Sequence, residues 1–225
     1  MSGILINNLF SSLREGEIAF EENFHLDVNP NFLDEKGRTW LQEIYEDLDG
    51  IGKNPLLEKL KFDLKINRTL LIFDFELSFN RYRLKSFRSE LYDDFSFPFV
   101  ESHKRLCRTY EKECMKAGLQ ARHWQGPTIA TQCFGEAEEI GDLTGNGSPG
   151  WKLRAFNEAQ VDLQSRIHGY KIFRISPYET IMTSGALRRL DQMLMSPTEE
   201  QRKVVLRWLL RKMEIEQDTE KQNQP

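Results

Sequence analysis

The sequence predicts an α/β fold in which a mixed central sheet is flanked by helices. Residues 59–79 (KLKFDLKINRTLLIFDFELSF) contain two β-rich runs on either side of Asn67-Arg68, a pattern typical of a β-hairpin. Residues 151–167 then have helical periodicity and are followed by the strand-like GYKIFRIS, residues 169–176. A helix followed by a strand after a hairpin favours an α/β sandwich in which the last strand joins the sheet.

The elements before the hairpin are predicted from periodicity and capping residues. Leu5, Leu9 and Leu13 recur at helical spacing within 3–22, and 27–37 (DVNPNFLDEKG) has the composition of a loop. We expect Thr39 to cap a helix from Trp40 to about Leu48. Its apolar face comprises Trp40, Leu41, Ile44, Tyr45 and Leu48.

After the hairpin, we expect a helix from Phe99 to about Ala117 that stops at Gly118, and an irregular segment over 119–150. Gly169 is the expected end of the 151–167 helix. The last predicted helix is amphipathic, with Ser196 as its cap, and precedes a tail (QDTEKQNQP) of disordered composition. This predicts one domain over 1–196 with a helical insertion at about 90–149, followed by a C-terminal helix and tail over 197–225.

Composition sets limits on location and partners. The chain has 39% hydrophobic residues, enough for a core, and no run of about 18 apolar residues that would predict a membrane span. The start, MSGILINNLF, lacks the features of a signal peptide, and three scattered cysteines fit reduced thiols, so we predict a cytoplasmic location. The net charge of −4 gives no global signature of nucleic-acid binding, but residues 81–88 (RYRLKSFR) carry four cations and no acid.

One face of the predicted hairpin carries carboxylates. Alternation along the strands places Asp63, Asp74 and Glu76 together with Ile72 on one face. The opposite face is entirely apolar and comprises Phe62, Leu64, Leu71, Phe73, Phe75 and Leu77. Converging carboxylates suit Mg²⁺ or Mn²⁺, which activates water in phosphodiester hydrolysis. The alternative is a half-exposed strand on which Asp74 pairs with an arginine or lysine across the sheet.

Cations near the expected strand end suit a phosphate-bearing partner such as DNA. Arg81 and Arg83 follow the strand as candidate phosphate clamps, and Lys85 and Arg88 extend the same basic stretch. Lys152 and Arg154 begin the helix that precedes the last strand and are expected near the same edge.

The order of these residues resembles that of the PD-(D/E)XK nuclease superfamily, in its branch near very-short-patch repair endonucleases. A helix with Glu43 comes first, followed by a strand with Asp63 and a second strand with Asp74 and Glu76. A further helix and the ending GYKIFRI complete the order. The resemblance, over about 39–89 and 150–176, implies a three-layer restriction-endonuclease core and a metal-dependent endonuclease acting on DNA. It implies metal ligation by Glu43, Asp63, Asp74 and Glu76, and catalysis by Asp63, Asp74, Glu76 and Lys152.

This sequence departs from the motif of that superfamily. Either Ile72 stands where the first acid of the second strand belongs, or Glu76 replaces the motif lysine. Three functions therefore stay open. One is an active nuclease in which Lys152 supplies the missing lysine, and another is an inactive nuclease-fold module that binds nucleic acid or a protein. The third is a soluble interaction domain whose resemblance to nucleases is a topological accident.

Two further clusters have a functional and a structural interpretation. A structural zinc would use His103, Cys107, Cys114 and Cys133, but the absence of a CxxC motif favours buried thiols. The C-terminal helix has a basic face with a tryptophan, comprising Arg202, Lys203, Arg207, Trp208 and Arg211. For that helix we favour packing of Val205, Trp208 and Leu209 on the domain, on a second copy of the chain or on a protein partner over a nucleic-acid interface.

Overall fold

The computed structural model describes residues 2–120 and 123–215, and these form an α/β fold with ten α-helices around a mixed sheet. The central sheet has the order β1-β4-β5-β6, with β1 (Glu21–Glu22) and β4 (Leu64–Ile66) on one side and β5 (Thr69–Phe73) and β6 (Lys171–Ile175) on the other. Strand β5 is antiparallel to β4 and parallel to β6. The predicted hairpin and the predicted last strand are therefore both confirmed.

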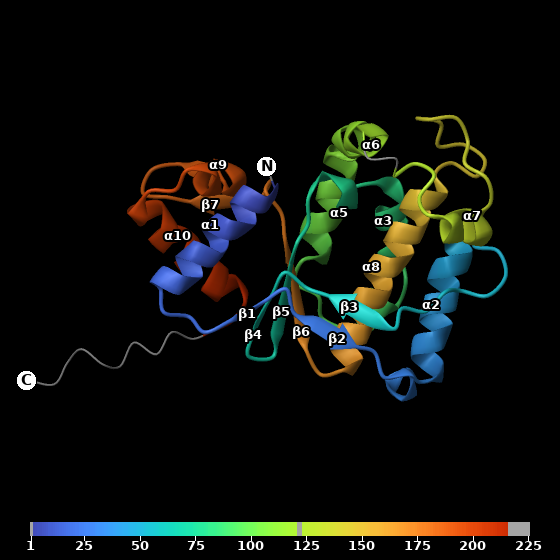
Figure 1. Cartoon of the computed structure of the whole chain (residues 1–225), viewed down its shortest axis with the longest axis horizontal. Helices are drawn as coiled ribbons and strands as arrows, with labels where there is room; N and C mark the ends of the chain where they lie inside the picture. The colour runs from blue at the N-terminus through green and yellow to red at the C-terminus, as the bar shows by residue number, and fades with distance from the viewer. Residues whose placement is uncertain (1, 121–122, 216–225) are drawn as a thin grey trace, which may run out of the picture.

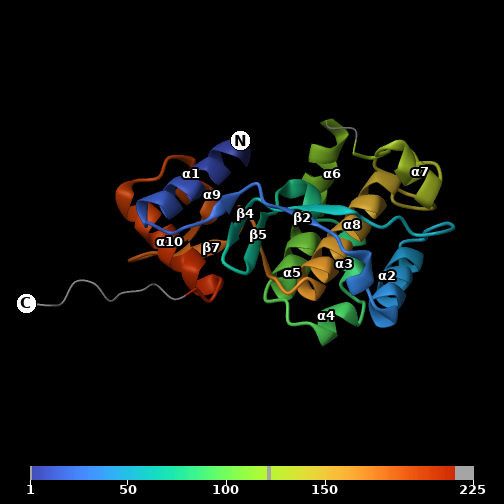
Figure 2. The same cartoon turned by 60° about the horizontal axis from the view of Figure 1, so that its bottom comes forward.

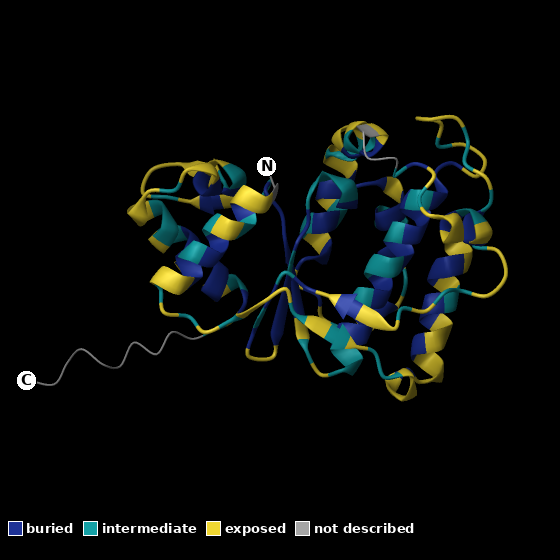
Figure 3. Cartoon of the chain, viewed as in Figure 1, coloured by how far each residue is buried: buried dark blue, intermediate teal, exposed yellow. Residues whose placement is uncertain are grey.

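Helices cover both faces of this sheet, as Figure 1 shows. Leu70 and Ile172 face a layer that includes α2 (Glu35–Asp47), α3 (Arg81–Ser86), α5 (Val100–Thr109), α7 (Thr128–Phe134) and α8 (Pro149–Ile167). Leu71 and Phe173 face a second layer made of α1 (Ser2–Glu15), α9 (Leu190–Met195) and α10 (Glu199–Lys212). Figure 3 shows buried residues on the inner sides of both layers.

Smaller elements complete the chain, and several are clearer in the turned view of Figure 2. Two further antiparallel pairs form, one from β2 (His25–Asp27) and β3 (Lys59–Lys61), the other from β7 (Thr180–Met182) and β8 (Leu187–Arg189). The remaining helices are the 3-10 turns η1 (Pro30–Phe32) and η2 (Glu76–Ser78), and the α-helices α4 (Leu91–Asp94) and α6 (Glu111–Gln120).

The second hairpin strand ends earlier than predicted. The Asp74 N–H still donates to the Ile175 carbonyl, but the chain then turns through η2 and begins α3 after Asn80. The Asn80 side chain accepts hydrogen bonds from the backbone N–H groups of Tyr82 and Arg83, which caps α3 and fixes the end of the extended segment. Glu76 is therefore no longer on a strand, and the predicted alternation past Phe73 is wrong.

The predicted apolar face of the hairpin is also wrong at Phe62. Leu64 and Phe73 pack on the α1/α10 side, whereas Phe62 packs on the α2/α8 side. The reason is that β3 and β4 belong to different sheets, so alternation does not continue from one to the other.

Several helix boundaries differ from those predicted because other residues supply the caps. Helix α2 begins after Asp34, whose side chain accepts from the Gly37 N–H, while the Thr39 hydroxyl donates to a carbonyl inside the helix. Helix α10 begins after Thr198, which forms a capping box with Gln201, so Ser196 is not the cap. Helix α1 ends at Glu15, whereas the helical periodicity in the sequence extended over residues 3–22. The tail over 217–225 lies outside the described residues.

The region after α3 is more helical than predicted. Residues 99–117 form parts of two helices that meet at Tyr110, and α7 lies within the segment predicted to be irregular. Helix α6 also continues through Gly118, where a Cβ atom would lie 2.2 Å from the Trp151 ring. Glycine at 118 thus permits a close approach of α6 to α8 instead of ending a helix.

Other predictions are confirmed. Leu5, Leu9 and Leu13 are buried in α1, the four predicted apolar residues within α2 and Leu48 just after it are buried, and Gly169 has φ of 78° after α8. In α10, Val205 and Leu209 are buried against the sheet, so this helix belongs to the same core. Among the described residues, no helix combines the length and the apolar character needed to cross a membrane.

Candidate functional site

The carboxylate of Asp74 lies at the end of β5 and is fully engaged by its neighbours. Arg174 Nη1 donates to Asp74 Oδ1 and Oδ2 at 3.1 and 3.0 Å, and His103 Nε2 lies 3.0 Å from Oδ2. The Ser78 hydroxyl donates to Oδ1 at 3.1 Å. Asp74 is 3% exposed and Arg174 is 1% exposed, so this is a buried ion pair whose hydrogen-bonding capacity is used inside the protein.

This pair continues into a larger network. Arg174 Nε donates to Asp162 Oδ1 at 2.8 Å, and Arg83 and the Tyr92 hydroxyl both donate to Asp162 Oδ2. Residues 154, 158 and 162 follow at i, i+4 and i+8 on one face of α8, so that Arg154 and Glu158 join the network from the same helix. Its three carboxylates and three guanidinium groups balance in charge: Asp74, Glu158, Asp162, Arg83, Arg154 and Arg174.

The electrostatics of the network stabilise the ionised forms. Burial by itself would raise the pKa of Asp74, but the Arg174 charge and the contact with His103 outweigh burial and hold this pKa well below its ordinary value. For Arg174, burial opposes the charge, but Asp162 and Asp74 raise its pKa well above the ordinary value. Asp63 differs, because burial raises its pKa against the lowering effect of the Phe73 N–H.

The carboxylates predicted as metal ligands do not gather around one point. Asp63 Oδ2 accepts the Phe73 backbone N–H at 2.7 Å, and Glu43 lines an exposed hollow beside Lys36 and Glu90. Glu76 starts η2. Within residues 2–120 and 123–215, no three Asp, Glu, His or Cys side chains form a group able to hold a metal ion. The donor set therefore does not fit the expected Mg²⁺ or Mn²⁺ ion, because the strand that was to align the acids ends at Phe73.

Lys152 does not lie at Asp74 either. Its ammonium is 2.7 Å from Asp49 Oδ2, in the connection after α2. Positions 152 and 154 project in nearly opposite directions from a helix, so Arg154 faces the network and Lys152 faces away from it. Lys152 therefore cannot act at Asp74 as the missing motif lysine, because it lies on the other face of α8.

The predicted phosphate-binding cations are dispersed. Arg83 is 1% exposed and bonded to Asp162, so its prediction as a phosphate clamp is wrong. Arg81 is paired with Glu111, Lys85 donates to the Asp47 carbonyl, and Arg88 lines a small hollow with both. Arg154 donates to Glu158 and to the Ser78 hydroxyl. Helix formation after Asn80 is the reason, since it turns Arg83 inward and leaves Arg81 and Arg88 exposed.

A pocket of about 390 Å³ opens above the network at the ends of the parallel strands. Its lining includes Asp74, Arg174, Arg154, Asn157 and His123. Burial and the nearby Arg154 lower the pKa of His123, which favours its neutral form. Ligands of α/β sheets commonly bind at this end of the strands. Here the charged groups of the floor are already paired, so the pocket offers a ligand mainly polar edges and apolar walls.

The cysteines are buried thiols, as the structural interpretation favoured. Cys107, Cys114 and Cys133 are free, and the four predicted zinc ligands do not form a metal-binding group within the described residues. His103 instead contacts Asp74. Burial raises the pKa of Cys107 to about 12 and that of Cys114 to about 11.

We expect the three thiols to be unreactive toward Ellman's reagent in the folded protein and to react fully in guanidinium chloride, because all three are buried and the reactive thiolate form is disfavoured at Cys107 and Cys114. Absorbance at neutral pH with and without denaturant measures this. Rapid reaction of a native thiol would contradict the burial.

Sequence reasoning missed the central partners of Asp74. Arg174 interrupts the apolar KIFRI strand and lies opposite Ile72 in the parallel register, and Asp162 lies on the buried face of α8. The available signals were a cation within an apolar strand and the i, i+4, i+8 spacing of 154, 158 and 162. Neither signal identifies its partner without the register between β5 and β6.

The sequence profile of a family of unknown function (DUF7255) matches residues 43–196. The match runs from within α2 to the end of α9 and contains every residue of the charged network, whereas α1 and α10 lie outside it. No curated protein and no solved structure gives a significant match.

Proposed function

The chain belongs to this family of unknown function, and we propose that it is a catalytically inactive nuclease-like module that binds nucleic acid. The order of elements supports a restriction-endonuclease-like core. Helix α2 precedes the antiparallel β4–β5 hairpin, and α8 then leads into β6, which pairs parallel with β5. This is the order that the resemblance to PD-(D/E)XK nucleases implies.

The observation that carries the inactive assignment is the pairing of Asp74. A divalent ion at this carboxylate would have to displace Arg174 Nη1 and the contact to His103 Nε2. Arg174 would then keep its charge in a buried position with one of its two acids lost, which is energetically costly. Magnesium also requires several oxygen ligands in a regular octahedron, and Asp63, another predicted ligand, instead accepts a hydrogen bond from the Phe73 backbone N–H.

We predict that the wild-type protein neither nicks supercoiled plasmid in Mg²⁺ or Mn²⁺ nor shows a heat of metal binding that depends on Asp74. Isothermal titration calorimetry of the wild type and Asp74→Asn, with a nicking assay on the same samples, measures both. Glu43→Gln is the matched control, since it removes another predicted ligand that lies on an exposed surface.

If Asp74→Asn folds poorly, the nicking assay on the wild-type protein with and without chelator still tests the inactive assignment. Nicking by wild type that is lost in chelator would overturn the inactive assignment. Retarded migration of nucleic acid in chelator, without cleavage, supports the binding function.

A further inference from the structure

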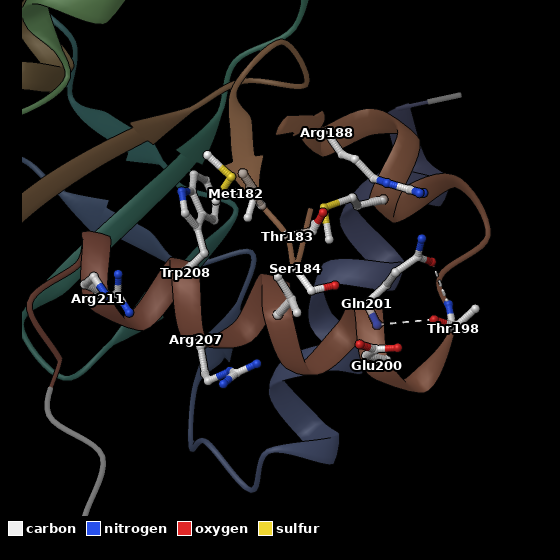
Figure 4. Close-up of a pocket in the computed structure, with 13 residues that line it drawn as sticks. Met182, Thr183, Ser184, Arg188, Thr198, Glu200, Gln201, Arg207, Trp208 and Arg211 are labelled. Atoms are coloured by element: carbon white, nitrogen blue, oxygen red, sulfur yellow. Dashed lines mark hydrogen bonds between the residues drawn. The ribbon is translucent and has the colours of Figure 1, made fainter. Parts of the chain in front are cut away.

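A second groove lies on the opposite side of the sheet from the Asp74 network. It runs between the β7–β8 hairpin and α10 and has a volume of about 590 Å³. Figure 4 shows the side chains that line it, with Trp208, Arg207 and Arg211 from α10 and Met182 and Arg188 from the hairpin. We call this the α10 groove.

The α10 groove is positively charged. Arg188, Arg207 and Arg211 line it and are exposed, and Glu200 is the acid in its lining. Among the described residues, none of these three arginines has a carboxylate partner within ion-pair distance. Arg207 and Arg211 are one turn apart on α10, so their guanidinium groups emerge from the same side of the helix.

The part of α10 that lines a separate hollow beside α1 provides a contrast. Arg202 is paired with Glu15 at 2.8 Å and Lys203 with Glu199 at 2.6 Å. Arg202 and Lys203 are thus neutralised beside α1 and the first turn of α10, whereas Arg207 and Arg211 in the groove have no carboxylate partner in the part of the chain that the structure describes. Unpaired guanidinium groups are the side chains that bind phosphate through two parallel hydrogen bonds.

An aromatic ring accompanies these cations. Trp208 is half-buried in the wall of the α10 groove, and Lys212 Nζ lies 5.1 Å from its ring centroid. Met182 is 68% exposed on the facing hairpin and extends the apolar surface beside the indole. In proteins that bind single-stranded nucleic acid, cations contact the phosphate backbone and bases stack on aromatic rings. The arginines and Trp208 of the groove provide both kinds of group.

We propose that the α10 groove binds single-stranded nucleic acid, with phosphates on Arg207, Arg211 and Arg188 and a base against Trp208. The inference rests on the proposed binding function and names its site. A single strand fits better than a duplex, because the bases of a duplex are paired and stacked on one another and leave no free face for Trp208.

The test is fluorescence anisotropy with fluorescein-labelled dT20, a 20-base-pair duplex and poly-glutamate as probes, each titrated with the whole 225-residue chain in chelator. The groove variant is Arg207→Ala with Arg211→Ala. Its charge-matched control is Arg202→Ala with Lys203→Ala, which removes two positive charges from the paired side of α10. Trp208→Leu tests the aromatic contact.

The groove variant is expected to weaken dT20 binding at least tenfold and to reduce the dependence of log affinity on log salt by about 1.4, since each phosphate contact on a single strand contributes about 0.7. Trp208→Leu is expected to weaken it about tenfold. The control variant is expected to bind within about twofold of wild type. Urea unfolding curves confirm that each variant is folded.

The other outcomes separate the two proposals. Binding of dT20 by wild type that is equal in the groove and control variants would overturn the α10 groove and leave the binding function standing. Tighter binding of the duplex would overturn the single-strand assignment. Absence of binding to both nucleic acids would overturn both proposals, and binding of poly-glutamate in their place would identify an acidic protein as the partner class.

Discussion

Asp74→Asn is expected to lower the free energy of unfolding by about 3–5 kcal/mol at pH 7, the usual effect of removing one partner from a buried ion pair. The substitution preserves shape but leaves Arg174 with a single carboxylate partner, Asp162, in a site that is 1% exposed. Urea or guanidinium unfolding followed by circular dichroism measures this.

Asp63→Asn is the matched control because the same chemical change removes the other predicted strand ligand. The asparagine oxygen can still accept the Phe73 N–H, and burial disfavours the charged form of Asp63. We therefore expect unchanged or slightly increased stability at neutral pH. In a carboxylate cluster built for a metal ion, both substitutions would relieve repulsion in the ion-free protein, so a stabilising effect of Asp74→Asn would contradict the ion-pair interpretation.

The pH dependence of stability follows from the same two groups. The pKa of folded Asp74 lies below the unfolded value of about 3.9, so its stabilising contribution is complete above that pH and is lost as pH falls through the folded pKa. The pKa of Asp63 is raised, so its destabilising contribution is present at neutral pH and disappears in acid. Both differences in stability should therefore shrink in acid. Wild type loses its advantage over Asp74→Asn below about pH 4, and Asp63→Asn loses any advantage over wild type once Asp63 is protonated.

Asp162→Asn is expected to have the second large effect, also a loss of about 3–5 kcal/mol. Asp162 is 0% exposed and accepts hydrogen bonds from Arg83, Arg174 and Tyr92, so the change leaves two buried guanidinium groups without their shared acceptor charge. Unfolding by denaturant at pH 7 measures the loss.

Two controls grade this effect. Tyr92→Phe removes a neutral hydroxyl that donates to Asp162 and accepts from Arg83 Nη1, and should cost about 1.5–3 kcal/mol. Asp191→Asn removes the partially exposed pair with Arg189 and should cost at most about 1 kcal/mol. An Asp162→Asn effect no larger than that of Tyr92→Phe would show that the network contributes little to the fold.

Elements with strong local signals were predictable. The hairpin was correctly placed around Asn67-Arg68, whose asparagine has φ of 52°, and β6 and α8 lie where the apolar periodicity placed them. Boundaries were less predictable, because a cap competes with neighbouring candidates: Asp34 rather than Thr39 caps α2, and Thr198 rather than Ser196 caps α10. A side-chain hydrogen bond of that kind depends on a few backbone angles that periodicity does not report.

The sequence by itself determined the α/β class, the β4–β5 hairpin with β6 as the last strand of the central sheet, and the burial of the cysteines. Only the tertiary structure decided the partners of the buried charges around Asp74. The parallel register between β5 and β6 brings Arg174 to Asp74, and the rotation of α8 brings Asp162 to Arg174 while turning Lys152 away. The physical reason is that patterns along the chain report whether a residue faces a core, whereas the pairing of buried charges depends on contacts between segments about 100 residues apart.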